Sequence, residues 1–254
     1  MKQILLFICL SVLFASCRKQ VPLQFSTKDY EARTKLNCKP GNCTYIHLEI
    51  PEASGPEAAS QNINKVLFQF VSSKICLDNE KKTSSYDTLA QHFIASYDEV
   101  NRIYPEEAIA WEANFKVSHK ALSATTYQVV WDYYIFTGGA HGLQASKVFF
   151  FNLDTGETIS TKDLFLNYEG FKNYAESEFK KQLGIEGSYA AAGFTFEDGK
   201  FQLPENFYQT TNEWVLYYNP YEIAPYVQGA SIVKLPKEKV QTYLNPLHFK
   251  NESL

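Results

Sequence analysis

Basic residues are scarce in this 254-residue sequence, since 24 lysines and arginines are outnumbered by 28 aspartates and glutamates. The formal net charge of -4 argues against a nucleic-acid-binding protein, because such proteins usually carry a basic surface that displaces phosphate counterions. Internal repeats and low-complexity segments are absent, which excludes solenoid and compositionally biased chains. After residue 14, no apolar run approaches the length of a membrane span.

Motifs that carry catalysis are also missing. The sequence has no Gly-x-Ser-x-Gly nucleophile motif, and no two of its five histidines form His-x-x-x-His or His-x-His. The five histidines are His47, His92, His119, His141 and His248, and they are scattered singly along the chain. We therefore predict no metal site, no cofactor and no enzymatic activity.

The residues that are abundant describe a globular chain. Hydrophobic residues make up 45% and charged residues 20%, which is enough apolar surface for a core. Aromatic residues reach 15%, and this favours many β-strands, whose half-buried surfaces accommodate such side chains.

The N-terminus has the features of an export signal. Lys2 precedes an apolar run from Ile4 to Phe14, which is too short to span a bilayer. The run ends in Ala15-Ser16-Cys17, which resembles the lipobox of bacterial lipoproteins. We predict a signal peptide over residues 1–16, lipidation (diacylglycerol and palmitate) at Cys17 and a polar tether over 17–27, so the chain would be anchored in the cell envelope, facing the periplasm. A plain secretory signal is the alternative.

Three cysteines remain for the exported part. Cys38 and Cys43 flank a Pro-Gly turn, so they can face each other across a hairpin, and we predict a Cys38–Cys43 disulfide with Cys76 as a buried thiol. A pairing that involves Cys76 is the alternative. A Cys-x4-Cys metal site is disfavoured because no second Cys/His pair with zinc spacing follows.

Hydrophobic periodicity predicts an α+β fold with antiparallel sheets, packed helices and two consecutive subdomains. Helical spacing marks residues 63–75, 86–97 and 171–183, and residues 52–59 are expected to form a loop. Alternation predicts a meander of three strands near 111–117, 127–135 and 146–153. Further strands are expected at 30–36, 44–50, 194–196, 201–203, 207–210, 213–218 and 231–235.

Two clusters are candidates for binding. The first, Thr137-Gly-Gly139-Ala-His141-Gly142, places His141 on a glycine-rich turn between two strands, which suits a ligand. Its alternative interpretation is a simple chain reversal. The second spans residues 214–229 and is rich in tyrosine and proline, with Tyr218, Tyr221 and Glu222 as candidate contacts to a protein or glycan. The alternative interpretation of this segment is that its alternating aromatic side chains belong to the core.

The order of five short motifs resembles an exported bacterial family with paired DUF4163 and DUF3298 domains. The motifs are Asn42-Cys-Thr-Tyr45 leading to Ile50-Pro51, Ile63-Asn-Lys65, Thr137–Gly142, Asn152–Gly156 before Asp163-Leu-Phe165, and Tyr218–Gly229. The resemblance implies a DUF4163-like subdomain over 28–155 and a DUF3298-like subdomain over 156–254. It extends to the lysozyme-binding extracellular domain of an anti-sigma factor and to the non-catalytic region of a peptidoglycan deacetylase.

Sigma-factor binding and deacetylation do not transfer, because the sequence shows neither a sigma-binding segment nor a deacetylase motif. The resemblance implies instead a non-catalytic, membrane-anchored module that binds a lysozyme-like protein or peptidoglycan. A hydrolase or metal-dependent enzyme centred on His141 is the alternative, and it requires a carboxylate or a second imidazole within hydrogen-bond reach of His141. A structural envelope lipoprotein without a specific small ligand is a third interpretation.

Overall fold

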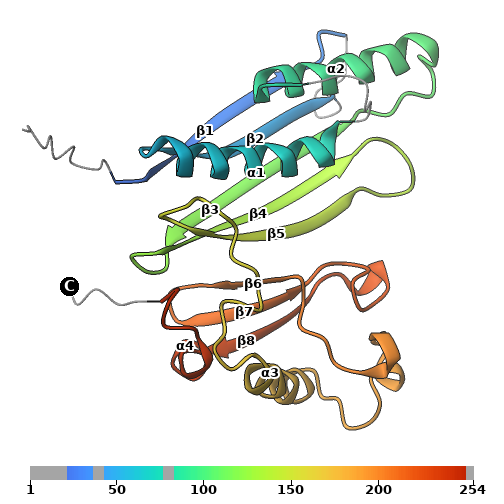
Figure 1. The fold of residues 1–254 in the computed structure, drawn as a ribbon. Helices are drawn as coiled ribbons and strands as arrows, with labels where there is room; N and C mark the ends of the chain where they lie inside the picture. The colour runs from blue at the N-terminus through green and yellow to red at the C-terminus, as the bar shows by residue number, and fades with distance from the viewer. Residues whose placement is uncertain (1–21, 37–42, 77–82, 250–254) are drawn as a thin grey trace, which may run out of the picture.

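A computed structural model describes residues 22–36, 43–76 and 83–249. It has the expected α+β architecture, with two sheets that form two subdomains (Figure 1). The first sheet has the order β1-β2-β3-β4-β5, and its strands are β1 Gln24–Arg33, β2 Tyr45–Ser54, β3 Glu112–Ala121, β4 Thr126–Phe136 and β5 Leu143–Asn152. The predicted meander β3-β4-β5 is antiparallel, as expected.

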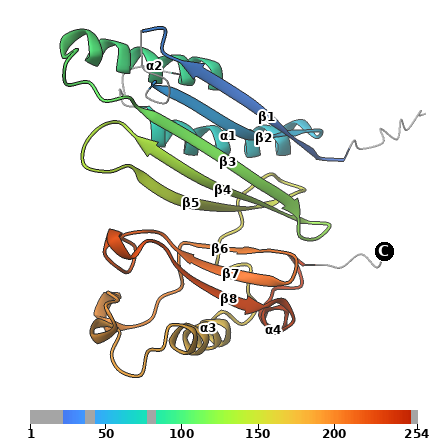
Figure 2. The same cartoon turned by 180° about the vertical axis from the view of Figure 1, so that it is seen from behind.

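Two helices, α1 (Glu57–Ile75) and α2 (Tyr86–Ile103), lie between β2 and β3 in the chain and cover one face of this sheet (Figures 1 and 2). Both helices bury the side chains that the periodicity had indicated, against apolar residues of β2. These are Ile63, Leu67 and Val71 of α1, Leu89, Phe93 and Tyr97 of α2, and Ile46, Leu48 and Ile50 of β2. Because the chain crosses over through the two helices, β2 and β3 pair in parallel.

The prediction of a loop over residues 52–59 is wrong. The β2 strand continues to Ser54, and α1 begins at Glu57 directly after Pro56. The extension is stabilised by Asn64, whose side chain accepts a hydrogen bond from the Ala53 nitrogen (2.8 Å) and donates one to the Ala53 oxygen (2.9 Å). Pairing with β1 and the contact with Asn64 therefore prolong a strand that local sequence would end at Pro51.

The first strand also begins earlier than expected. β1 starts at Gln24, so the last four residues of the predicted 17–27 tether belong to the sheet. Strand β1 is largely exposed and carries polar side chains on both faces, so it lacks the alternation that marks a strand. Its pairing with β2 along ten residues sets its length.

The second sheet has the order β6-β7-β8, with β6 Asn206–Gln209, β7 Glu213–Tyr218 and β8 Ser231–Pro236. Helix α3 (Tyr168–Gln182) and the short α4 (Lys237–Val240) belong to the same subdomain. Gly184 adopts φ +65° just after α3, as expected for a left-handed residue that ends a helix.

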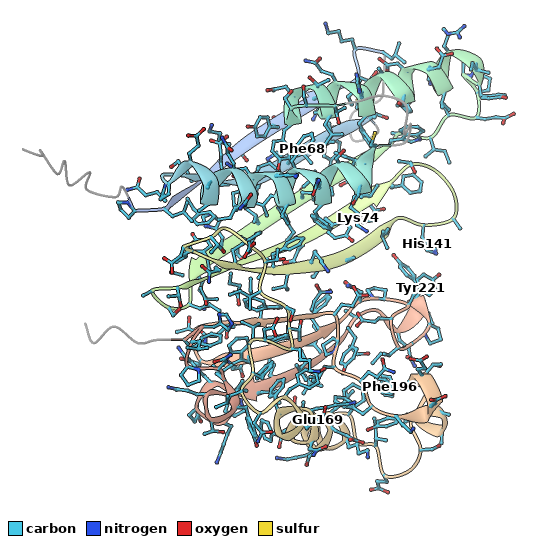
Figure 3. All side chains as sticks on the ribbon, in the orientation of Figure 1. Phe68, Lys74, His141, Glu169, Phe196 and Tyr221 are labelled. Carbon is cyan, nitrogen blue, oxygen red and sulfur yellow. The ribbon has the colours of Figure 1, made fainter. Side chains whose placement is uncertain are left out.

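The strands expected at 194–196 and 201–203 do not form. These residues lie in an irregular segment with a 3-10 turn at Glu197–Gly199. Their rings enter the core instead, since Phe196 and Phe201 are buried and pack on Phe179 of α3, with ring centroids 5.6 and 5.5 Å apart. Figure 3 shows Phe196 within this subdomain. Aromatic alternation here reports burial and not strand pairing.

The two subdomains share a core and a hydrogen-bonded seam. Strand β6 lies beside β5 (Figures 1 and 2), and apolar side chains of β4 and β5, namely Val130, Val148 and Phe150, belong to the core of the second subdomain. Asn206 Oδ1 accepts from the Val148 nitrogen at 3.0 Å. Gln128 and Gln209 exchange two buried hydrogen bonds between the Gln128 side chain and the Gln209 backbone, 2.7 and 3.0 Å long. These bonds fix how the subdomains sit together.

Candidate functional site

Two loops from different subdomains meet at one end of this seam. The 137–142 loop joins β4 to β5, and the 219–230 loop joins β7 to β8. Figure 3 shows His141 and Tyr221 pointing toward each other from these loops. His141 and Tyr221 are 80 residues apart in the sequence, and their contact joins the two candidate clusters into one surface.

Glycines shape the first loop. Gly138 and Gly139 have φ values of +104° and +92°, which side chains rarely adopt, and a Cβ atom on either would meet no other atom within 4 Å. Gly142 is required for a different reason, since a Cβ there would lie 2.4 Å from Cζ of Tyr134. The predicted site residue Gly139 is thus exposed and sets the backbone that presents His141.

His141 is held between two tyrosines. Its ring stacks on Tyr226, with centroids 4.1 Å apart and an interplanar angle of 14°. Nδ1 lies 3.0 Å from the Gly142 oxygen and Nε2 lies 3.4 Å from the Tyr221 hydroxyl. In a neutral imidazole, Nδ1–H donates to the carbonyl and Nε2 accepts from the hydroxyl. We call His141, Tyr221 and Tyr226 the junction cluster.

The backbone of Tyr221 is unusual. Its φ of +71° is one of two positive values among the described non-glycine residues, and such a conformation is costly for a bulky side chain. The side chain is 61% exposed, so burial of the ring does not compensate for this cost. The surrounding loop must therefore impose the conformation.

Polar side chains next to Tyr221 supply that constraint. Glu222 accepts hydrogen bonds from the backbone nitrogens of Asn219 (2.8 Å) and Glu205 (2.9 Å). Burial raises the pKa of Glu222, and these two bonds act in the opposite direction. The Asn219 side chain accepts a hydrogen bond from the backbone nitrogen of Ser146 in β5 (2.7 Å) and donates one to the Ser146 backbone oxygen (3.1 Å). The second loop is thereby attached to the first sheet.

The predicted site residues divide into two groups. His141 and Tyr221 are exposed and adjacent, whereas Tyr218 is 1% exposed and donates a hydrogen bond to the Gln202 oxygen at 2.7 Å. Burial raises the pKa of Tyr218 well above its ordinary value. As a contact residue Tyr218 is corrected to a core residue, and Glu222 is a residue that fixes the loop.

Tyr226 and Asn219 were not singled out from the sequence. Tyr226 lies within the aromatic segment, but only the tertiary structure brings it against His141, where its hydroxyl donates to the Gly142 oxygen at 2.9 Å. Asn219 has no local signature, because its partner Ser146 is 73 residues away. Long-range pairing of this kind leaves no periodic pattern.

A hollow of about 220 Å³ adjoins the first loop. It is lined by Asn114, Lys116, Asp132, Tyr133, Tyr134 and Gln144. Tyr134 is also the residue that packs against Gly142, so the hollow lies beside the end of this loop.

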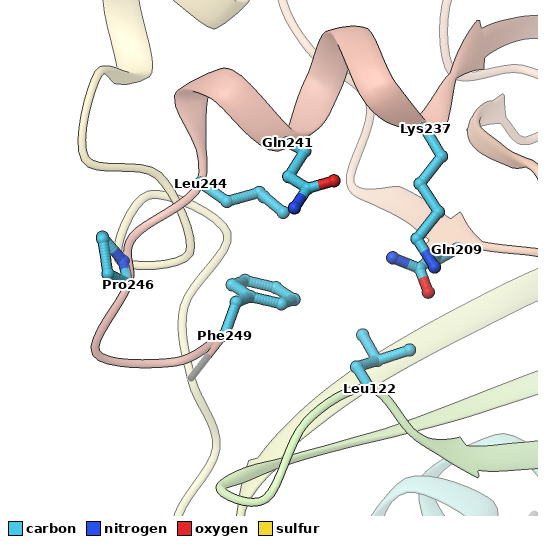
Figure 4. A pocket seen from close by; sticks show the side chains of 7 residues that line it. All are labelled: Leu122, Gln209, Lys237, Gln241, Leu244, Pro246 and Phe249. Atoms are coloured by element: carbon cyan, nitrogen blue, oxygen red, sulfur yellow. The ribbon is translucent and has the colours of Figure 1, made fainter. Parts of the chain in front are cut away.

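A second cavity lies near the opposite ends of the strands, between the β3–β4 turn and α4 (Figure 4). Its volume is about 310 Å³, and it is lined by Leu122, Gln209, Lys237, Gln241, Leu244, Pro246 and Phe249. None of the residues proposed from the sequence lines it.

The partners of His141 bear on the enzymatic alternative. In the described part of the chain, its ring nitrogens contact a carbonyl and a hydroxyl, and neither has a carboxylate or a second imidazole within hydrogen-bond distance. These are not the partners that a histidine-centred hydrolase requires. The absence of enzymatic activity stays a prediction.

The N-terminal predictions lie outside the described residues. Cys17, the signal peptide over 1–16 and Cys38 all fall there, so lipidation and the Cys38–Cys43 disulfide stay predictions. Among the described residues, no helix is both long and apolar enough to cross a bilayer.

Comparison with known proteins identifies the second subdomain. Residues 162–238 match the family model described as "Protein of unknown function (DUF3298)". None of the curated protein sequences matches the chain. A DUF3298 family protein from Bacteroides fragilis has a similar crystal structure, with a TM-score of 0.66 and 16% identity over 92% of this chain and 99% of that chain.

A second crystal structure, of a DUF3298 family protein from Pseudomonas aeruginosa, gives a TM-score of 0.58 and 16% identity over 90% of this chain and 96% of that chain. At this identity the likeness shows the fold. Together with the family model, it leads to one conclusion: the chain carries a DUF3298 domain, of unknown function, over residues 162–238.

Proposed function

We propose that this protein is a non-catalytic binding module of the bacterial cell envelope, anchored by a lipid on Cys17, and that its junction cluster contacts a lysozyme-like protein or peptidoglycan. One observation carries the proposal. Two loops from different subdomains bring His141, Tyr221 and Tyr226 together, and Tyr221 is held 61% exposed in a costly backbone conformation. The choice of partners comes from the resemblance to the lysozyme-binding domain.

The chemistry of the junction cluster suits such a partner. A tyrosine offers a broad apolar face with a hydroxyl at its rim, and few rotatable bonds are lost when it is buried on binding. The stacked His141–Tyr226 pair presents a flat surface beside it. A surface that is already ordered in the free protein loses less entropy on binding, which raises its affinity.

The experiment is capture of the purified protein on immobilised lysozyme and on insoluble peptidoglycan. Tyr221→Ala removes the exposed ring, and we expect it to reduce capture on whichever material binds by at least about tenfold, the range for an aromatic contact residue. Tyr104→Ala is the matched control, because Tyr104 is 57% exposed at the end of α2. Equal capture of both variants and the original protein would remove the junction cluster from the proposal.

The anchor has its own test. Growth of the bacterial host with a labelled fatty acid should label the original protein and leave Cys17→Ser unlabelled, with the variant shifting from the membrane to the soluble fraction. An unlabelled original protein would contradict lipidation without affecting the junction cluster.

A further inference from the structure

Four side chains with metal-binding groups lie on one face of the β1–β2 pair. Asp29 and Glu31 alternate along β1, and His47 and Glu49 alternate along β2. The antiparallel register pairs Asp29 with Glu49 and Glu31 with His47. Since the β2 residues between them are buried under the helices, these four point to the opposite face, the side seen in Figure 2.

The distances within this group are short. Nε2 of His47 lies 3.1 Å from Oδ1 of Asp29 and 3.7 Å from Oε1 of Glu31. One ligand atom each from Asp29, His47 and Glu49 lies within 4.8 Å of the others. In a tetrahedral zinc site with bonds of about 2.0–2.2 Å, neighbouring ligand atoms are about 3.3 Å apart. Small rotations of exposed side chains are enough to reach that geometry.

The electrostatics favour a cation. In the described part of the chain, neither lysine nor arginine forms an ion pair with Asp29, Glu31 or Glu49. The neighbouring Lys28 is paired with Glu52 instead. Like charges placed across adjacent strands are unfavourable, and a divalent ion relieves that repulsion.

One carboxylate of the group is already oriented. Oε2 of Glu49 accepts a hydrogen bond from the Val117 nitrogen at 2.9 Å, and the Glu49 carbonyl accepts one from Nε1 of Trp131 at 3.1 Å. This arrangement leaves Oε1 of Glu49 available as a ligand. Hydrogen bonds that hold a ligand in place are typical of metal sites.

Strand β3 adds a neighbouring oxygen. Asn114 pairs with His47 in the parallel register, and its Oδ1 is buried without a hydrogen-bond partner within the described residues. A cavity of about 440 Å³ lined by Glu31, Arg33, Tyr45, His47 and Asn114, among others, adjoins the group. It offers space for water or another ligand that completes the coordination of an ion.

We propose that Asp29, His47 and Glu49, with Glu31 beside them, bind a divalent transition-metal ion of the zinc class. The imidazole nitrogen selects this class over calcium and magnesium, which prefer oxygen ligands alone. The sequence led us to expect no metal site. The proposed ligands come from two strands and are brought together only by strand pairing, so no sequence motif marks them. It is independent of the junction cluster and of the proposed function.

The test is calorimetric titration of the full-length, tag-free protein with zinc chloride. We expect one zinc ion per chain, with affinity lowered at least about tenfold by His47→Ala and by Asp29→Asn, since each removes a direct ligand. Asp29 is 61% exposed, so Asp29→Asn should leave the fold intact. His248→Gln, which removes a histidine outside the group, is the matched control.

Thermal unfolding supplies a second readout. Zinc should raise the unfolding temperature of the original protein and of His248→Gln, but not that of Asp29→Asn, because only a folded site binds the ion. Calcium and magnesium should have little effect on any of the three. The proposal would be overturned if the original protein bound no zinc, or if Asp29→Asn and His47→Ala bound zinc as tightly as the original protein.

Discussion

The β1–β5 subdomain buries aliphatic side chains of β2 under two long helices, whereas the β6–β8 subdomain relies more on aromatic rings, several of them from irregular segments. Phe179 of α3 contacts the rings of Tyr189, Phe194, Phe196, Phe201 and Tyr218. In the first subdomain regular elements supply the core. In the second, large rings allow three short strands and one long helix to enclose a comparable core.

The largest effect that would test this difference is expected for Phe179→Ala. Phe179 is fully buried, and its loss leaves a cavity among five rings, so we expect unfolding free energy to fall by about 3–5 kcal/mol in urea denaturation. Leu166→Ala, at a residue 74% exposed in the same subdomain, should change it by less than about 0.5 kcal/mol. Similar values for the two variants would contradict the importance of the ring cluster.

Phe93→Ala is the corresponding core substitution in the first subdomain, and it allows the two subdomains to be compared directly. We expect a loss of about 3–5 kcal/mol there too, because Phe93 is 1% exposed. The two variants should differ in hydrogen exchange. The amide of Thr195, which donates to the Ile223 oxygen at 2.7 Å, should lose protection in Phe179→Ala more than in Phe93→Ala.

An intermediate effect is expected at the seam. Asn219→Ala leaves the buried backbone nitrogen and oxygen of Ser146 without their partner, which should cost about 1–3 kcal/mol. Exchange of the Ser146 amide should accelerate. Asn173→Ala, at an exposed position of α3, is the control. Unchanged exchange at Ser146 would show that the second loop is not held by this contact.

The smallest effect concerns two carboxyl groups of the second subdomain. Burial raises the pKa of Glu222, so its contribution to stability is present at low pH and declines as pH rises through that raised pKa. Hydrogen bonds from Lys180 and Tyr189 lower the pKa of Glu176, so its contribution is present above the ordinary glutamate pKa and is lost as pH falls. Unfolding temperatures of Glu222→Gln and Glu176→Gln between pH 3 and 7 should therefore depart from the original protein with opposite pH trends.

Sequence patterns predicted the regular parts of the fold well. The helical spacing of Ile63, Leu67 and Val71, and the alternation along β4, both report which side faces a core, and a core contact follows directly from them. The strands expected at Phe194–Phe196 and Phe201–Leu203 failed because buried rings in an irregular segment give the same alternation.

Contacts between distant residues were beyond prediction. The extension of β2 is stabilised by pairing with β1 and by Asn64, and the second loop is attached to β5 through Asn219. Neither contact leaves a periodic trace in the sequence. Of the candidate site, His141 and Tyr221 could be named from composition and turn chemistry. Their contact could not, because it is set by how two subdomains pack along β5 and β6.

The most direct test of the central claim is Tyr221→Gly, measured for both stability and binding. Glycine adopts the φ of +71° without strain, so the account predicts equal or higher stability, by up to about 1 kcal/mol, together with loss of capture on lysozyme or peptidoglycan. A variant that is as stable as the original protein and still captured equally well would contradict the claim that the exposed ring of Tyr221 is a binding contact.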